Sequence, residues 1–67
     1  MNTGIVTDFD RKGGFGLIDS DDGHVVLFNS DTLDTVDLQT LHIGSRVQFI
    51  EQPDPNGVRA ECLRLCQ

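Results

Sequence analysis

The residues whose types and spacing could contact a ligand lie in the run Gly14-Phe15-Gly16-Leu17-Ile18. Glycine within a strand lets another backbone or a flat ligand approach closely, because these positions have no Cβ. Alternation along the strand points Phe15 and Leu17 to the same face. Two basic residues, Arg11 and Lys12, lie just before the run. The stretch therefore offers an aromatic and apolar surface next to two positive charges.

The sequence shows no pattern typical of catalysis: neither a nucleophile with its base nor a phosphate-binding loop is present. His24 and His42 have the right ligand types for zinc, but the paired short spacings of zinc modules are missing. We expect His24 to be a turn residue and His42 a loop residue. The prediction is a protein that is not an enzyme and that uses no metal, cofactor or small-molecule substrate.

Charge argues against a strong nucleic-acid binder. Five Lys and Arg residues stand against eleven Asp and Glu residues, a formal net charge of -6. A surface that binds phosphates normally shows a basic patch. Only Arg11 and Lys12 are adjacent among the basic residues. Any affinity for a nucleic acid would therefore have to come from stacking.

The 67 residues correspond to one small domain, over residues 1–67. No stretch approaches the ~20 apolar residues of a membrane span, and the start resembles no signal peptide. We therefore expect a cytoplasmic protein without a membrane partner. With 63–65 extended, the Cα atoms of Cys62 and Cys66 would lie about 13 Å apart, at ~3.3 Å per residue. This separation exceeds disulfide reach and predicts reduced thiols.

Hydrophobic alternation and turn residues predict five strands, at 5–9, 15–19, 25–29, 46–52 and 58–65. Both faces of 5–9 include apolar residues, which indicates a bulge or a strong bend. Pro53 and Pro55 are expected to end the strand ladder, because they lack an N–H. The predicted core comprises Val6, Phe9, Ile18, Val26, Phe28, Val47, Phe49, Ala60 and Leu63.

Several motifs match one known family at corresponding spacing. They are Gly4-Ile5-Val6-Thr7-Asp8-Phe9-Asp10, Gly13-Gly14-Phe15-Gly16-Leu17-Ile18, Asp22-Gly23, Val26-Leu27-Phe28 and Val47-Gln48-Phe49. Over almost its whole length, and without a gap, the chain resembles the cold-shock domain. The resemblance implies an all-β fold, a five-stranded antiparallel OB-type barrel that binds single-stranded RNA and DNA. On that fold, the leucines of the connection 30–43 should pack onto the barrel without forming an independent helix. Asn29-Ser30-Asp31 should cap a single helical or 3₁₀ turn over Thr32 and Leu33.

The resemblance also indicates what has become of the binding face. Family members stack bases on aromatic residues of the first three strands. Here the tryptophan position is Asp8, the second phenylalanine of the glycine-spaced run is Leu17, and a later aromatic run is Leu27-Phe28-Asn29-Ser30. The usual lysines are replaced by Thr7 and Gly13, and the aromatic of the long loop by Leu38. The candidate nucleic-acid-binding residues are Phe15, Leu17, Leu27, Asn29, Lys12, Arg11 and Arg59.

Two functions remain open from the sequence. The first is weak binding of single-stranded RNA or DNA on a degenerate stacking platform, where each base stacked on an aromatic is worth roughly 1 to 3 kcal/mol. The second is contact with a protein, or with a second copy of the chain, on the same fold. The patch for this alternative comprises Phe15, Leu17, Leu27 and Leu38, with Asp8, Asp10 and Asp31 at its rim.

Overall fold

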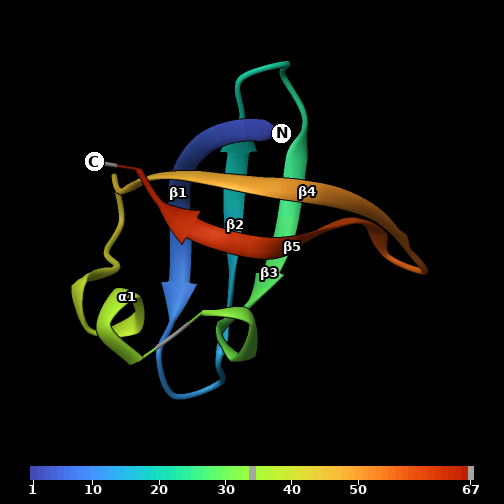
Figure 1. Cartoon of the computed structure of the whole chain (residues 1–67). Coiled ribbons are helices and arrows are strands. Elements are labelled where there is room, and N and C mark those ends of the chain that lie inside the picture. The colour runs from blue at the N-terminus through green and yellow to red at the C-terminus, as the bar shows by residue number, and fades with distance from the viewer. Residues whose placement is uncertain (34, 67) are drawn as a thin grey trace.

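The structure is a computed structural model that describes residues 1–33 and 35–66. Its five strands close into a barrel in the order β1-β2-β3-β5-β4. They are β1 (Asn2–Asp10), β2 (Phe15–Ser20), β3 (Val25–Asn29), β4 (Arg46–Asp54) and β5 (Gly57–Leu65). Figure 1 shows β4 and β5 crossing the sheet of β1, β2 and β3. The predicted five-stranded OB-type barrel is confirmed, and four of its five pairings are antiparallel, whereas β3 and β5 pair in parallel.

Two bulges let the barrel bury residues that simple alternation would place on opposite faces. In β1, Val6 pairs with Ile18 and Asp8 with Leu17, so Thr7 is the extra residue. Val6 and Phe9, three positions apart, therefore both point inward, as the predicted bulge requires.

The second bulge lies in β5. Opposite Phe49, β5 contributes an extra residue, Cys62, which has a φ of 53°. Ala60 and Leu63 are consequently both buried. Both cysteines are free thiols: Cys62 is exposed and Cys66 half-buried.

The core is close to the predicted one. Its buried residues are Val6, Ile18, Val26, Phe28, Leu41, Val47, Phe49, Ala60 and Leu63. Phe9 is only half-buried, with its ring centroid 5.6 Å from that of Phe28. Leu41 replaces it as a fully buried residue, because the connection between β3 and β4 folds back onto the barrel.

That connection contains more helix than expected. A 3₁₀ turn at Ser30–Thr32 begins where Asn29 Oδ1 accepts the N–H of Asp31 at 3.1 Å. The capped turn was predicted two residues later. A short helix, α1 (Thr35–Thr40), follows and lies beside the barrel in Figure 1. Leu33 and Leu41 pack onto the barrel core, as expected, but the expectation that the connection forms no helix was wrong. No helix among the described residues is long and apolar enough to cross a membrane.

The prediction that Pro53 ends the ladder was also wrong. Pro53 pairs with Val58, and the hairpin continues to Asp54 and Gly57. Phe49 is the last residue of β4 that pairs with β1. Beyond it, one side of β4 is free, so a residue without an N–H can sit there without losing a ladder hydrogen bond.

Candidate nucleic-acid interface

A row of outward-facing residues runs across four neighbouring strands. Asp8 in β1 pairs with Leu17 in β2, Leu17 pairs with Leu27 in β3, and Leu27 pairs with Arg59 in β5. Directly paired residues point to the same face of a sheet. The two leucines are half-buried, whereas Asp8 and Arg59 at the ends of the row are exposed.

A second row lies next to the first. Asp10, Phe15 and Asn29 are paired across β1, β2 and β3. All four phenylalanines of the chain are described, and only Phe15 is exposed, at 55%. The structure therefore brings together the predicted residues Phe15, Leu17, Leu27, Asn29 and Arg59 on one face.

An open hollow of about 490 Å³ lies beside Phe15. Its lining comes from β2, β3 and the following 3₁₀ turn, with Phe15, Leu27, Asn29 and Asp31, and from the β4–β5 hairpin, with Asp54, Asn56, Arg59 and Glu61. The hollow thus combines an exposed aromatic ring with a rim in which carboxylates outnumber basic groups. Leu38, which was predicted for the protein-contact patch, is not among its described lining residues.

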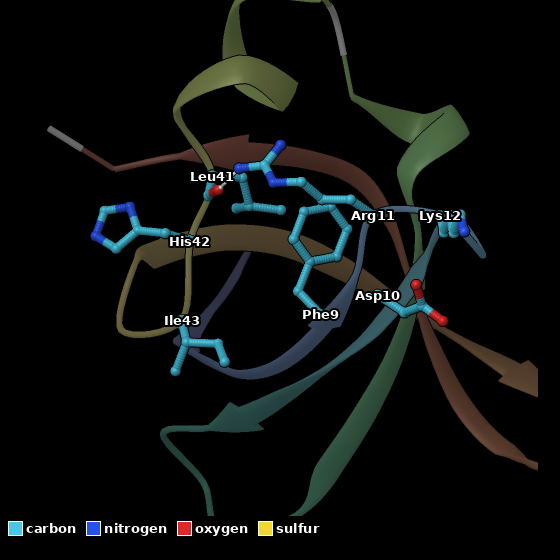
Figure 2. Close-up of a pocket in the computed structure, with 7 residues that line it drawn as sticks. All are labelled: Phe9, Asp10, Arg11, Lys12, Leu41, His42 and Ile43. Atoms are coloured by element: carbon cyan, nitrogen blue, oxygen red, sulfur yellow. Dashed lines mark hydrogen bonds between the residues drawn. The ribbon is translucent and has the colours of Figure 1, made fainter.

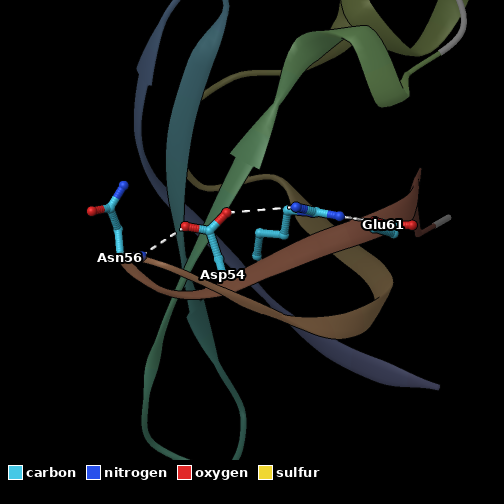
Figure 3. A network of polar contacts seen from close by, with 4 residues as sticks. Asp54, Asn56 and Glu61 are labelled. Atoms are coloured by element: carbon cyan, nitrogen blue, oxygen red, sulfur yellow. Dashed lines mark hydrogen bonds and ion pairs between the residues drawn. The ribbon is translucent and has the colours of Figure 1, made fainter.

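Arg59 forms ion pairs with two carboxylates from the same hairpin. Its Nη2 and Nε donate to Glu61 Oε1 at 2.6 and 3.1 Å, and Nη1 lies 3.6 Å from Asp54 Oδ2. Asp54 also accepts the N–H of Asn56 at 2.9 Å, which fixes the turn (Figure 3). The hydrogen bonds that Arg59 donates to Glu61, and then the charge of Glu61, raise the pKa of Arg59 above its ordinary value. The guanidinium is therefore permanently charged, but its field is largely cancelled.

Arg11 is turned away from this hollow. Its guanidinium donates to the carbonyl of Leu38 at 3.0 Å. It also donates to the carbonyl of Leu41 and lies 5.1 Å from the ring centroid of Phe9 (Figure 2). These contacts attach the end of α1 to the β1–β2 turn. Arg11 and Lys12 line a second hollow with Phe9, Leu41 and Ile43. Lys12 is exposed, and no ion pair of its side chain is recorded within residues 1–33 and 35–66.

The polar partners of Arg59 were missed by sequence reasoning. Glu61 stands two positions after Arg59, on the same face of a strand, which is a signal that the sequence contains. Asp54 comes from the preceding strand across the turn, and its approach to Arg59 depends on β4 continuing past Pro53.

A separate polar cluster joins the β2–β3 turn to β4. His24 Nδ1 lies 2.9 Å from Asp22 and Nε2 lies 2.8 Å from Glu51. Among the described residues, this is the group whose ligand types could hold a cation. His42 lies elsewhere, with Nδ1 3.0 Å from the carbonyl of Thr40. His24 is thus a turn residue and His42 a loop residue, as predicted.

The family comparison agrees with the fold. The model of the 'Cold-shock' DNA-binding domain matches residues 2–65, which contain all five strands. A comparison with curated proteins gives no match. Cold-shock domains bind single-stranded nucleic acids and are not enzymes. This chain, a barrel with its exposed aromatic on the sheet of β1, β2 and β3, belongs to the cold-shock DNA-binding domain family.

Proposed function

We propose that this chain binds single-stranded RNA or DNA weakly, by stacking a base on Phe15. The observation on which the proposal rests is the exposed ring of Phe15 at the edge of an open hollow. An aromatic face accepts any base, because every base has a π-face, and one such stack contributes roughly 1 to 3 kcal/mol. The family membership supplies the class of ligand.

Weak binding follows from what surrounds Phe15. The row that crosses the sheet consists of Asp8, Leu17, Leu27 and Arg59, which provide no further aromatic ring. Asp8 and Asp10 place exposed carboxylates on the same face, where they repel phosphates. A single stack with few cations to follow the backbone is consistent with affinity in the micromolar range or weaker.

The test is a titration with an oligothymidine and with an unrelated single-stranded RNA at low salt. Backbone amide shifts should move in β2 and β3 around Phe15, and Phe15→Ala should abolish these changes. Phe15→Leu is the matched variant, because it keeps an apolar side chain but removes the ring; binding should be lost there too. Ile50→Ala, which changes a residue exposed at 39% on β4, should bind like the native chain. Unchanged binding by Phe15→Leu would contradict the proposal.

A second candidate, contact with a protein or a second copy, is favoured by the composition of the same face. Phe15, Leu17 and Leu27 form a continuous apolar strip with Asp8 and Asp10 at one side. Such a patch is a common interaction surface. Under this alternative, Leu17→Asp and Leu27→Asp would keep the fold and abolish self-association in sedimentation experiments. If the native chain sediments as a monomer and both variants sediment in the same way, the face is not used for self-association.

A further inference from the structure

Three carboxylates, those of Asp31, Asp54 and Glu61, line the hollow beside Phe15. Asp31 comes from the 3₁₀ turn after β3, and Asp54 and Glu61 come from β4 and β5. One guanidinium, that of Arg59, stands between the two acids of the β4–β5 hairpin. The polar surface offered to a bound base is therefore rich in hydrogen-bond acceptors.

These acceptors are only partly used. Both hydrogen bonds from Arg59 to Glu61 end on Oε1. A carboxylate has two oxygens and about four acceptor positions, so Glu61 keeps capacity to accept from a ligand. Asp54 is more occupied, because Oδ1 accepts from Asn56 and Oδ2 faces Arg59. Asp31 is exposed and lines the same hollow from the 3₁₀ turn.

Bases differ in whether they can donate to such a rim. Adenine, cytosine and guanine have an exocyclic amino group, whereas thymine and uracil have a carbonyl oxygen where cytosine has its amino group. An amino group next to a carboxylate gains a charge-assisted hydrogen bond. A carbonyl oxygen in the same place would meet a negative charge with no proton between them.

We propose that this hollow selects the base stacked on Phe15, favouring bases with an exocyclic amino group over thymine and uracil. Glu61 and Asp31 are the residues that determine this preference, as acceptors of the amino group. The inference rests on the proposed function, since it requires a base stacked on Phe15. It adds a preference among bases that Glu61 and Asp31 determine.

The experiment compares heptamers of deoxyadenosine, deoxycytidine and deoxythymidine by fluorescence anisotropy at low salt. The deciding pair is deoxycytidine against deoxythymidine, because both are pyrimidines and stacking separates them least. We expect the deoxycytidine heptamer to bind about fivefold tighter or more, the smallest discrimination expected of one good base contact. Tighter or equal binding of the deoxythymidine heptamer overturns the inference and leaves the proposed function standing. No binding of any heptamer overturns the proposed function itself.

Variants identify the origin of the preference. Glu61→Gln and Asp31→Asn keep side-chain size and replace an acceptor oxygen by an amide that also donates. At least one of them should reduce the deoxycytidine preference to about twofold or less, mainly by improving deoxythymidine binding. Asp19→Asn is the matched control: it removes the same charge from an exposed position of β2 outside the hollow. It should strengthen binding of all heptamers equally. An unchanged preference in both Glu61→Gln and Asp31→Asn also overturns the inference.

Discussion

The ring of Phe15 lies over Gly13, in the space that a side chain at position 13 would fill. A Cβ at Gly13 would lie 2.8 Å from Cδ1 of Phe15 and closer still to Cε1. Real Cβ atoms do not approach other atoms so closely, so the ring can rest there only because the residue is glycine. By its resemblance to the family, this position is one where a lysine is usual. The glycine that stands in place of the usual lysine at position 13 therefore also permits the present position of the Phe15 ring.

Gly13→Lys tests that link. The end of the Phe15 side chain is flexible, so the ring should move off the turn while the fold persists. The added lysine provides one phosphate contact, which should raise affinity at low salt and steepen the salt dependence by about 0.7 in log-log slope for a single strand. Anisotropy titrations at several salt concentrations measure both effects. Gln39→Lys adds the same charge on α1, and an equal change of slope in that control would contradict the prediction.

Restoring rings along the row across the sheet should recover binding. Asp8→Trp, Leu17→Phe and Leu27→Phe together add stacking surfaces in β1, β2 and β3, each worth roughly 1 to 3 kcal/mol when a base stacks on it. Salt can screen the repulsion from Asp8, but it cannot replace a missing ring. The measurement is anisotropy with a pyrimidine-rich single strand at low and moderate salt.

The control for that variant is Asp8→Asn, which removes the charge of Asp8 without adding a ring. We expect a small gain that fades as salt increases, whereas the gain of the triple variant should persist. If Asp8→Asn gains as much as the triple variant, charge and not stacking limits binding.

The strand pattern was predictable because it depends on local alternation and turn residues. Val26 and Phe28 point inward while Leu27 points outward, as the period of two requires. The positions of the cations were not predictable in the same way. The hydrogen bonds of Arg11 depend on how residues 38–41 fold back, 27 to 30 positions along the chain. The contact between Asp54 and Arg59 depends on β4 continuing past Pro53. A proline, which lacks an N–H, would by itself predict that the strand ends there.

Phe49→Ala should strongly destabilise the barrel. Phe49 is the largest of the fully buried side chains, so its truncation leaves a cavity and should cost about 3 to 5 kcal/mol. A domain of this size has little stability in reserve, and most molecules should then unfold. Thermal and urea unfolding measure the effect. Ile50→Ala, one position later on the outer face, should cost far less; similar losses in both variants would contradict the assigned faces.

Arg11→Ala should loosen the connection that buries Leu41. The guanidinium donates to the carbonyls of Leu38 and Leu41, and hydrogen bonds to a charged group contribute about 1.5 to 3 kcal/mol each when buried and less when exposed. We expect a loss of about 1 to 2 kcal/mol in the free energy of unfolding, together with faster amide exchange in α1. Lys12→Ala is the neighbouring control, with an exposed side chain. Equal stability of Arg11→Ala and Lys12→Ala would mean that the Arg11 contacts contribute nothing.

The ion pair between Asp21 and Arg46 should make stability fall in acid. The hydrogen bond from Thr3, and then that from Arg46 at 2.6 Å, hold the pKa of Asp21 below its ordinary value of 3.8, with partial desolvation opposing them. A depressed pKa in the folded state means that the unfolded chain takes up the proton first as the pH falls. The stability from this carboxylate is therefore complete above about pH 4, its unfolded value, and is lost as the pH falls through the folded pKa.

Asp21→Asn should lower stability at neutral pH and flatten the decline below pH 4, measured by urea unfolding across that range. Asp19→Asn removes a carboxylate from the neighbouring strand, and a decline flattened equally by both substitutions would show that Asp21 has no special part in it.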